Sequence, residues 1–358
     1  MFDGNMKNCM ESEVELVYLE ESDVDTPEYI SFFERYHGTD SFLKWKAKIH
    51  WYFHGFGFRL LVAKIGNEYV GQSCAYCTKS LVDGKRIDLW WGVDVFVLAD
   101  MRGRSIGKKM QQKLHDELPN FSSVSYAKLN GIIKRKVGAT ELLDVHFTYY
   151  PISSYFSLLS DLILKKIKRS FQFPRIRLPY FYPLVKLQPK EMQGLSIDLI
   201  DRKNMGDELS EFMEKCLAEE RFHVIRSKEF LQWKYTDNPN ISFKIISVSE
   251  KGQRIGCAVL SDVYEGSYVV TKARLVKVLD CMVLPGCGLS HKQLLTIAIN
   301  KCRQYWEMAP DGILDIHTSE LMLSITYPAV THMLSNIKCP KLKSGYVSYI
   351  DQDMERMY

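Results

Sequence analysis

A short basic segment with two glycines is the part of this sequence best suited to chemistry. Residues 93–109 read VDVFVLADMRGRSIGKK, an apolar run followed by a turn and then by a helical pattern. A helix N-terminus presents unpaired N–H groups and the positive end of the helix dipole, and both favour phosphate oxygens. Gly103 and Gly107 let the backbone approach such oxygens closely, while Arg104 and Lys108 add positive charge. The segment therefore predicts a diphosphate-binding turn.

Spacing excludes two common phosphate loops. A P-loop has four residues between its glycines and a Ser or Thr after its lysine, whereas here three residues separate Gly103 from Gly107 and Lys109 follows Lys108. The dinucleotide fingerprint G-x-G-x-x-G is also absent. The sequence contains no G-x-S-x-G, H-E-x-x-H or paired C-x-x-C pattern, so it predicts neither a hydrolase nor a metal site.

The turn resembles the signature of the GNAT acyltransferase superfamily, [Gln/Arg]-x-x-Gly-x-[Gly/Ala], which directly follows the fourth strand of that fold. It reads RGRSIG over Arg102–Gly107, with Ser105 where the family usually has glycine. The preceding run Asp94–Val97 is similar to the family's strand before the turn. Asn130, followed by Gly138, resembles a later family motif. The resemblance spans about ninety residues, from Phe58 to Tyr149.

The resemblance implies direct transfer of an acyl group from acetyl-CoA, as co-substrate and without a metal, to an amine. Splayed strands would expose backbone N–H groups that polarise the thioester carbonyl, and holding both substrates in one cleft would orient them for attack. The residues that the resemblance assigns to CoA are Val95, Val97, Arg102, Gly103, Arg104, Ser105, Ile106, Gly107, Lys108 and Asn130.

The residues for proton transfer are less closely specified. Asp94 aligns with a carboxylate often found in the family and is the candidate base, although a buried strand aspartate can equally pin the backbone. Trp91 stands where some members carry a catalytic glutamate. The family tyrosine that protonates the departing thiolate would fall near Lys134, and Tyr149 or Tyr150 on the last strand of this half could substitute for it. Asp94 and Tyr149 are the predicted catalytic residues.

Two similar runs of elements indicate a duplicated fold. A chain of 358 residues usually exceeds a single hydrophobic core. In each half, hairpins precede a strand, a glycine-bearing turn, a helix and further strands. We therefore predict two GNAT-like domains of the α/β (α+β) class, each with a mixed, mostly antiparallel central sheet flanked by helices. The expected strands span 14–19, 58–65, 69–80, 88–98, 123–127 and 142–150 in the first half and 195–200, 243–248, 255–263, 275–283, 312–316 and 345–350 in the second.

The expected domain junction is basic and interrupted by prolines. Residues 154–171 combine an apolar stripe with four cations, and three prolines follow within the next dozen positions. A packed connecting helix is favoured here over a helix that lies on an anionic membrane surface. The predicted division is 1–152 for a first domain with the acetyl-CoA site, 153–187 for the amphipathic helix and linker, and 188–358 for the second domain.

The second domain is predicted to be a degenerate copy. Its corresponding turn, Leu284–His291, lacks arginine and lysine, so no CoA site is expected there. The second domain would instead shape the acceptor pocket or stabilise the first domain. Residues 230–239 (FLQWKYTDNP) are similar to a segment of tandem GNAT proteins from bacterial surface-polysaccharide pathways, which implies an amino sugar as acceptor. A helix end that packs in the core is an equal alternative for this segment.

The bulk composition predicts a cytoplasmic protein. The net charge of +4 is mild, so no nucleic-acid partner is expected. The sequence has no run of about 18 apolar residues and no apolar signal segment near its start. The nine scattered cysteines, including the C-x-x-C at Cys74 and Cys77, are typical of reduced core thiols.

Two alternatives to an N-acyltransferase acting on a small amine remain open at this point. One is a non-catalytic CoA-fold binding module. The other is a FemXAB-like aminoacyl transferase, which would need a broad basic face for RNA. The sequence does not specify the oligomeric state.

Overall fold

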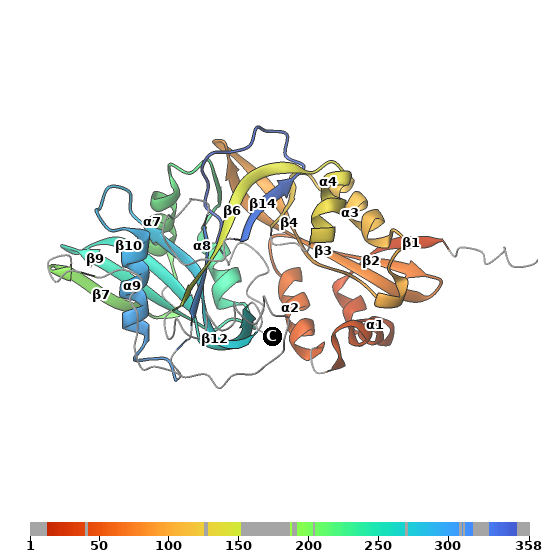
Figure 1. Cartoon of the computed structure of the whole chain (residues 1–358), viewed down its shortest axis with the longest axis horizontal. Helices are drawn as coiled ribbons and strands as arrows, with labels where there is room; N and C mark the ends of the chain where they lie inside the picture. Colours follow the sequence, from red (N-terminus) through yellow and green to blue (C-terminus); the bar gives the residue numbers. More distant parts are fainter. Residues whose placement is uncertain are drawn as a thin grey trace, which may run out of the picture. The chain divides into compact units, whose positions relative to one another are not determined.

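The computed structural model describes most of the chain and divides it into two compact units (Figure 1). The described residues are 13–39, 42–124, 128–151, 187, 192–202, 205–268, 271–307, 310, 312–317 and 329–348. Unit 1 comprises Met1–Thr78, Asp88–Thr140 and Leu334–Lys338, and unit 2 comprises Lys79–Ile87, Glu141–Met333 and Cys339–Tyr358. The basic helix expected at 154–171 lies outside the described residues and stays a prediction, as does the linker up to residue 186.

Unit 1 is built on a sheet whose strands follow the expected order. The strands are β1 (Val14–Leu19), β2 (Phe58–Ile65), β3 (Glu68–Val82), β4 (Lys85–Val97) and β5 (Phe121–Ser123). The first two pairings are antiparallel, and β5 runs parallel to β4. The β2–β3 hairpin turns at Gly66, whose φ of +61° suits glycine.

Helices cover both faces of the unit 1 sheet (Figure 1). α1 (Pro27–His37) and α2 (Phe42–Phe53) lie on one face, and α3 (Ile106–Glu117) and α4 (Lys128–Lys136) on the other. α1 begins as its sequence predicts, because the Thr26 side chain accepts a hydrogen bond from the Tyr29 amide and proline occupies the first helical position. On the α3 face, Ile106, Met110 and Leu114 recur at a spacing of four and are buried against the sheet.

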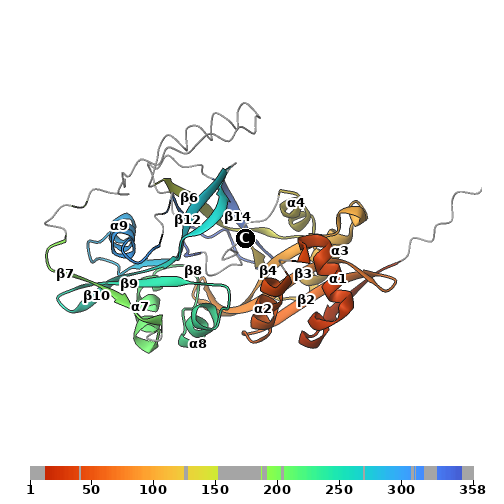
Figure 2. The same cartoon turned by 90° about the horizontal axis from the view of Figure 1, so that it is seen from below.

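The paired strands of unit 2 have helices on both sides (Figure 2). Its path runs β6 (Thr140–Pro151), β13 (Gly312–His317), β12 (Thr271–Val283), β10 (Gln253–Ser261), β9 (Phe243–Glu250) and β7 (Leu195–Ile200), with β11 (Tyr264–Tyr268) paired to β12. α9 (His291–Cys302) lies on one side, and α7 (Asp207–Leu217) and α8 (Lys228–Leu231) on the other. β8 (Phe222–Val224) pairs with the end of β3. The expected mixed sheets flanked by helices are therefore confirmed.

The last strands of the two halves differ from the expected arrangement. The expected strand at 345–350 is wrong over 345–348, which are irregular; the strand in this region is β14 (Ala329–Ser335). Its last residues, Leu334 and Ser335, pair with β5 and belong to unit 1. Most of β6 belongs instead to unit 2, where it pairs with β13. Each unit is thus completed by a segment from the other half of the sequence.

Asn336 ties the C-terminal segment of unit 1 to α3 and β5. Its side-chain oxygen accepts from the Phe121 amide at 2.6 Å, and its nitrogen donates to the carbonyls of His115 and Leu118 at 3.0 and 3.1 Å. These carbonyls lie at the C-terminal end of α3, where helix carbonyls lack partners of their own. Ser335 adds a hydroxyl contact of 2.7 Å to Ser122. The five residues 334–338 therefore close one end of unit 1.

Among the described residues, no helix is both long and apolar enough to cross a bilayer.

Candidate active site

A bulge at Asp94 reshapes strand β4. Asp94 has a φ of +50°, in the left-handed region that side chains other than glycine seldom adopt. Trp90 packs with the apolar cluster under α3, whereas the Phe96 ring stacks on Tyr36 of α1 with centroids 3.9 Å apart. Residues six apart on a regular strand would face the same side. One additional residue at Asp94 therefore reverses the alternation, as a β-bulge does.

Beyond this point β4 extends without β5 beside it. The two strands pair only at Trp90 with Phe121 and Trp91 with Ser122, and β4 continues to Val97. The Leu98 amide donates to the Val70 carbonyl of β3. Because backbone N–H and C=O groups alternate between the two edges of a strand, those of Val95 and Val97 point away from β3. The Val97 carbonyl accepts a hydrogen bond from the Arg102 Nε at 3.3 Å. The open edge thus presents the Val97 amide and the backbone of Val95, the two valines that the sequence predicts at the thioester.

Asp94 lies beside a lysine that the sequence analysis did not select. The Lys48 ammonium, on α2, is 3.8 Å from an Asp94 carboxylate oxygen, and both side chains are buried. The pair balances charge in the interior and joins α2 to the bulge of β4. This geometry suits pinning of the backbone and leaves the carboxylate directed toward α2. Lys48 also explains how a carboxylate is retained at this buried position.

The turn after β4 has the form expected for anion binding. A short 3₁₀ turn at Ala99–Met101 leads to Gly103, with a φ of +86°, and then to Ser105, which precedes α3. A Cβ added to Gly103 would meet no atom within 4 Å other than those of its chain neighbours. A Cβ added to Gly107 would lie 3.8 Å from a Val97 methyl. Both glycines therefore leave the turn open on their side-chain side.

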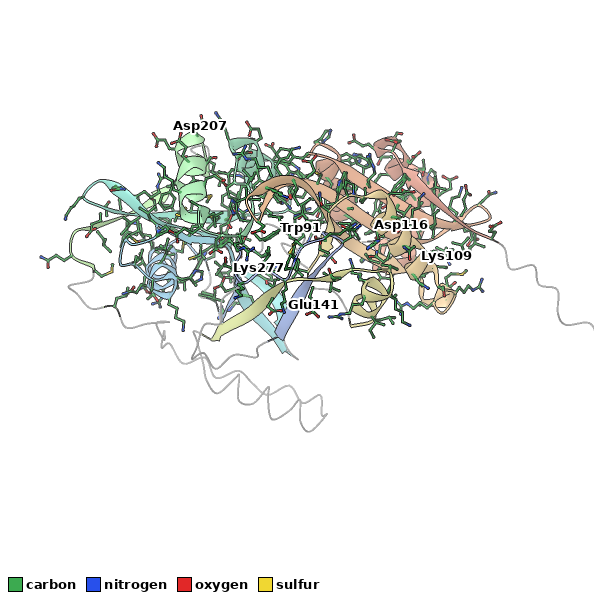
Figure 3. The ribbon with its side chains drawn as sticks, turned by 90° about the horizontal axis from the view of Figure 1, so that it is seen from above. Trp91, Lys109, Asp116, Glu141, Asp207 and Lys277 are labelled. Carbon is green, nitrogen blue, oxygen red and sulfur yellow. The ribbon has the colours of Figure 1, made fainter. Side chains whose placement is uncertain are left out.

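The first amides of α3 are available. The Ser105 hydroxyl makes no capping hydrogen bond, and the first intrahelical bond runs from the Lys109 amide to the Ser105 carbonyl at 3.0 Å. The amides of Ile106, Gly107 and Lys108 precede that bond and point off the end of the helix. Three exposed cations, Arg102, Arg104 and Lys108, lie on the same turn. Figure 3 shows Lys109 at the outside of α3, whereas Trp91 lies among the strands.

The matching turn of unit 2 is already satisfied. Ser290 caps α9 by accepting from the Gln293 amide at 3.2 Å, and the Gln293 side chain accepts from the Ser290 amide at 2.8 Å. This capping box occupies the amide of the third helical residue, whose counterpart at α3 is open. Residues 284–290 contain no arginine or lysine, and Lys292 is the one lysine in the first turn of α9. The start of α3 therefore has more cations and one more open amide than the start of α9.

Ser105 provides a test of backbone strain at the turn. Its φ of +59° and ψ of 14° place a residue with a Cβ in the left-handed conformation, which costs about 1 kcal/mol or more. We expect Ser105→Gly to raise the free energy of unfolding by about 0.5–1 kcal/mol after the entropy cost of glycine. Urea denaturation measures the free energy of unfolding of the unmodified chain and of the variant. Ser105→Ala, which keeps the strain and removes the hydroxyl, is the control; equal stability of the Gly and Ala variants would contradict the explanation.

Two other predicted site residues are less closely tied to the turn. Asn130 is half-buried on α4, and no hydrogen bond joins its side chain to the turn in the described part of the chain. The backbone of Tyr149 pairs with Leu314 in unit 2, and its side chain lies outside the described residues. Both assignments stay predictions.

A second residue that the sequence analysis left unassigned is Lys134. It lies on α4, is 3% exposed, and its ammonium is 5.0 Å from the Phe121 ring centroid. Burial lowers the pKa of Lys134 to about 7. Gly131, Lys134 and Val137 are all buried at a spacing of three, so the lysine occupies the inward face of its helix. That spacing is the one sequence signal for the burial of Lys134, and the neighbouring basic residues of the helix obscure it.

Comparison with known proteins gives matches in structure and none in sequence. No family model and no curated protein matches the sequence. The structure is similar to a GCN5-related N-acetyltransferase from Anabaena variabilis, with a TM-score of 0.55 and 11% identity over 90% of this chain and 72% of that one. It is also similar to a tandem GNAT protein from the clavulanic acid biosynthesis pathway, with a TM-score of 0.56 and 10% identity over 90% and 98% of the two chains.

The chain has the GNAT fold. The structure is also similar to the Saccharomyces cerevisiae N-myristoyltransferase with bound myristoyl-CoA, with a TM-score of 0.52 and 10% identity over 93% of this chain and 81% of that one. The tandem protein is matched over nearly its full length, so the GNAT fold accounts for both units. At these identities the similarity establishes the fold alone.

Proposed function

We propose that unit 1 binds an acyl-CoA at the turn between β4 and α3 and that the protein transfers the acyl group to an amine. The observation that supports this most strongly is the difference between the two turns. At α3 the first three amides are open and three cations lie on the turn, whereas at α9 a capping box occupies the third amide and Lys292 is the one cation in the first turn. The GNAT fold and the acyltransferases that share it favour the same reaction class.

Each part of the site has a role in this proposal. The amides of Ile106, Gly107 and Lys108 hold the diphosphate, and the side chains of Arg104 and Lys108 neutralise its charge. The open edge of β4 receives the thioester arm, and the Val95 amide donates to the thioester carbonyl. A fixed donor of this kind stabilises the negative charge that develops on that oxygen.

The acceptor is proposed to be a small-molecule amine that must lose a proton as the new bond forms. An amino sugar is the specific candidate, and it rests on the resemblance of residues 230–239 alone. In unit 2 this segment is largely interior: Trp233, Lys234 and Tyr235 are buried, and the Tyr235 hydroxyl donates to Asp280. The geometry of the segment thus favours core packing. The degenerate role of unit 2 and the domain limits 1–152 and 188–358 are likewise proposals.

A charge reversal in the first turn of α3 tests the proposed function. We expect Lys108→Glu to weaken acetyl-CoA binding at least about tenfold in calorimetry, because it places a carboxylate beside the diphosphate. Glutamate near a helix N-terminus stabilises the helix, so unfolding of α3 would not explain the loss. Lys292→Glu, in the first turn of α9, is the matched control and should bind as the unmodified chain does.

The outcomes separate the alternatives. Failure of the unmodified chain to bind acetyl-CoA or a longer acyl-CoA would refute the proposal. Binding without release of free CoA across a panel of amines, followed with a thiol reagent, would indicate the non-catalytic module. Release of CoA with one amine identifies the acceptor class.

A further inference from the structure

The positive charge of this protein is concentrated in the part of unit 1 that follows β4. Residues 102–139 contain nine lysines and arginines and two acidic residues, a net charge of +7, whereas the whole chain has a net charge of +4. The remaining residues are therefore acidic, with a net charge of −3. A local excess of this kind attracts anionic partners and orients them before contact.

The two helices of this region, α3 and α4, lie side by side on one face of the unit 1 sheet (Figure 1, Figure 2). A Cβ on Gly138 would lie 3.5 Å from the His115 ring, so the end of α4 lies beside the last turn of α3. His115 is ten residues from Ser105, which corresponds to about 15 Å along a helix. The last cations of α4 therefore lie beyond the reach of a diphosphate held at the first amides of α3.

Apolar side chains are exposed on α4 next to these cations. Leu129 and Ile132 are 69% and 42% exposed, and their spacing of three places them on one face of the helix. Lys136 continues that face at a spacing of four, and Arg135 precedes it; both are exposed. An apolar centre with a charged rim is the usual composition of a protein–protein contact.

The basic character of these helices is not cancelled by nearby acids. No acidic residue occurs in 102–115 or in 128–139. Asp116 and Glu117, between these ranges, accept hydrogen bonds from the side chains of Gln112 and Lys113. The exposed basic and apolar residues of the two helices are named the α3–α4 surface: Lys109, Leu129, Ile132, Arg135 and Lys136.

A thioester donor can carry its acyl group in either of two ways. CoA and an acyl carrier protein hold the thioester on the same phosphopantetheine arm, and they differ in what lies beyond the phosphate of that arm. In CoA this is a compact nucleotide, whereas in a carrier protein it is the surface of a small acidic domain. The α3–α4 surface extends about 15 Å from the turn and includes exposed apolar residues, so it favours the protein.

We propose that a small acidic carrier protein docks on the α3–α4 surface and presents its acyl thioester to unit 1. The proposal rests on the proposed function, because the phosphate of the arm must lie at the turn between β4 and α3 and the thioester at the open edge of β4. The C–N bond of the product forms as the C–S bond of the thioester breaks. The carrier keeps the sulfur as a thiol, whose proton replaces the one that the amine loses.

Calorimetry with an acetylated bacterial acyl carrier protein and the full chain tests the proposal. We expect the double variant Arg135→Gln, Lys136→Gln to bind this carrier at least about fivefold more weakly than the unmodified chain does. Its affinity for acetyl-CoA should stay within about twofold, because neither side chain reaches the diphosphate. The matched control is Lys85→Gln, Arg86→Gln, which removes two adjacent exposed cations from the start of β4.

A second double variant, Leu129→Gln, Ile132→Gln, is measured in parallel and should also weaken carrier binding. A folding defect in one double variant, detected by circular dichroism, then leaves the comparison decided by the other. Acetyl-CoA binding without carrier binding, or equal carrier binding by the unmodified chain and both variants, overturns the proposal while the proposed function stands. Absence of binding to both donors overturns both. Binding to phosphatidylglycerol vesicles in place of the carrier also overturns the proposal and assigns the surface to an anionic membrane.

Discussion

Replacing Arg226 by methionine is expected to lower the free energy of unfolding of unit 2 by about 3–5 kcal/mol, the range for breaking a buried ion pair. Arg226 and Asp280 are both fully buried, and the guanidinium contacts the two carboxylate oxygens at 3.2 and 3.0 Å. It also donates to the Val224 carbonyl at 2.9 Å and to the Ser348 hydroxyl at 3.1 Å. Loss of the guanidinium would leave the Asp280 charge in the interior with hydroxyl donors alone from Tyr235 and Tyr346.

The double variant Arg226→Met, Asp280→Leu separates the cost of a stranded charge from the loss of the pair. Replacing both partners by apolar groups removes the buried carboxylate, so part of the lost stability should return. Guanidinium chloride denaturation followed by tryptophan fluorescence measures the free energy of unfolding of the unmodified chain, of Arg226→Met and of the double variant. A double variant less stable than Arg226→Met would show that the pair is a net source of stability. The exposed pair of Arg221 and Asp83, at 2.6 Å, is the control and should contribute less than about 1 kcal/mol.

Lys48→Met is expected to destabilise unit 1 by about 3 kcal/mol, because it removes the ammonium from beside the buried Asp94 carboxylate. Asp94→Asn should cost less, since asparagine tolerates the left-handed conformation at this bulge and keeps the side-chain shape. The double variant Lys48→Met, Asp94→Asn should have a free energy of unfolding at least about 1 kcal/mol higher than that of Lys48→Met alone. Thermal or urea unfolding of the unmodified chain, the two single variants and the double variant measures this. If the two single losses of stability simply add in the double variant, the two side chains do not interact.

These variants also distinguish the two roles considered for Asp94. If the carboxylate only pins the bulge, Asp94→Asn keeps acyl transfer at a temperature where it is folded. If the carboxylate accepts the proton of the attacking amine, transfer falls by about a hundredfold or more while acetyl-CoA binding persists. The ion pair with Lys48 favours the first result.

The turn after β4 could be predicted because its requirements are local. A strand, two glycines and three cations within a few residues define where amides become available, and the structure places Gly103 in the left-handed conformation and leaves the amides after Ser105 open. Capping also follows from local sequence: the Ser290 and Gln293 spacing forms the box that fills the corresponding position of unit 2. Hairpins at Gly66 and Gly252 followed from the same kind of signal.

Burial of charged residues could not be predicted in this way. Lys48 lies in a helix rich in aromatic residues and Lys134 in a helix rich in lysine, and both resemble solvent-facing positions until the sheet that they contact is known. The final strand was misplaced for a related reason. Residues 345–348 have the alternation of a strand, but Tyr346 is held by contacts with Asp280 and Cys281, whereas β14 obtains its pairing from β5. Pairing across two hundred residues is decided by tertiary structure.

The contribution of residues 334–338 to unit 1 has a consequence for the order in which the protein can mature. During synthesis the ribosome releases the turn after β4 long before it releases Asn336, so the carbonyls at the end of α3 receive their Asn336 donor only after some two hundred further residues. We therefore expect the first half of the chain to complete unit 1 only after residues 334–338 have been synthesised.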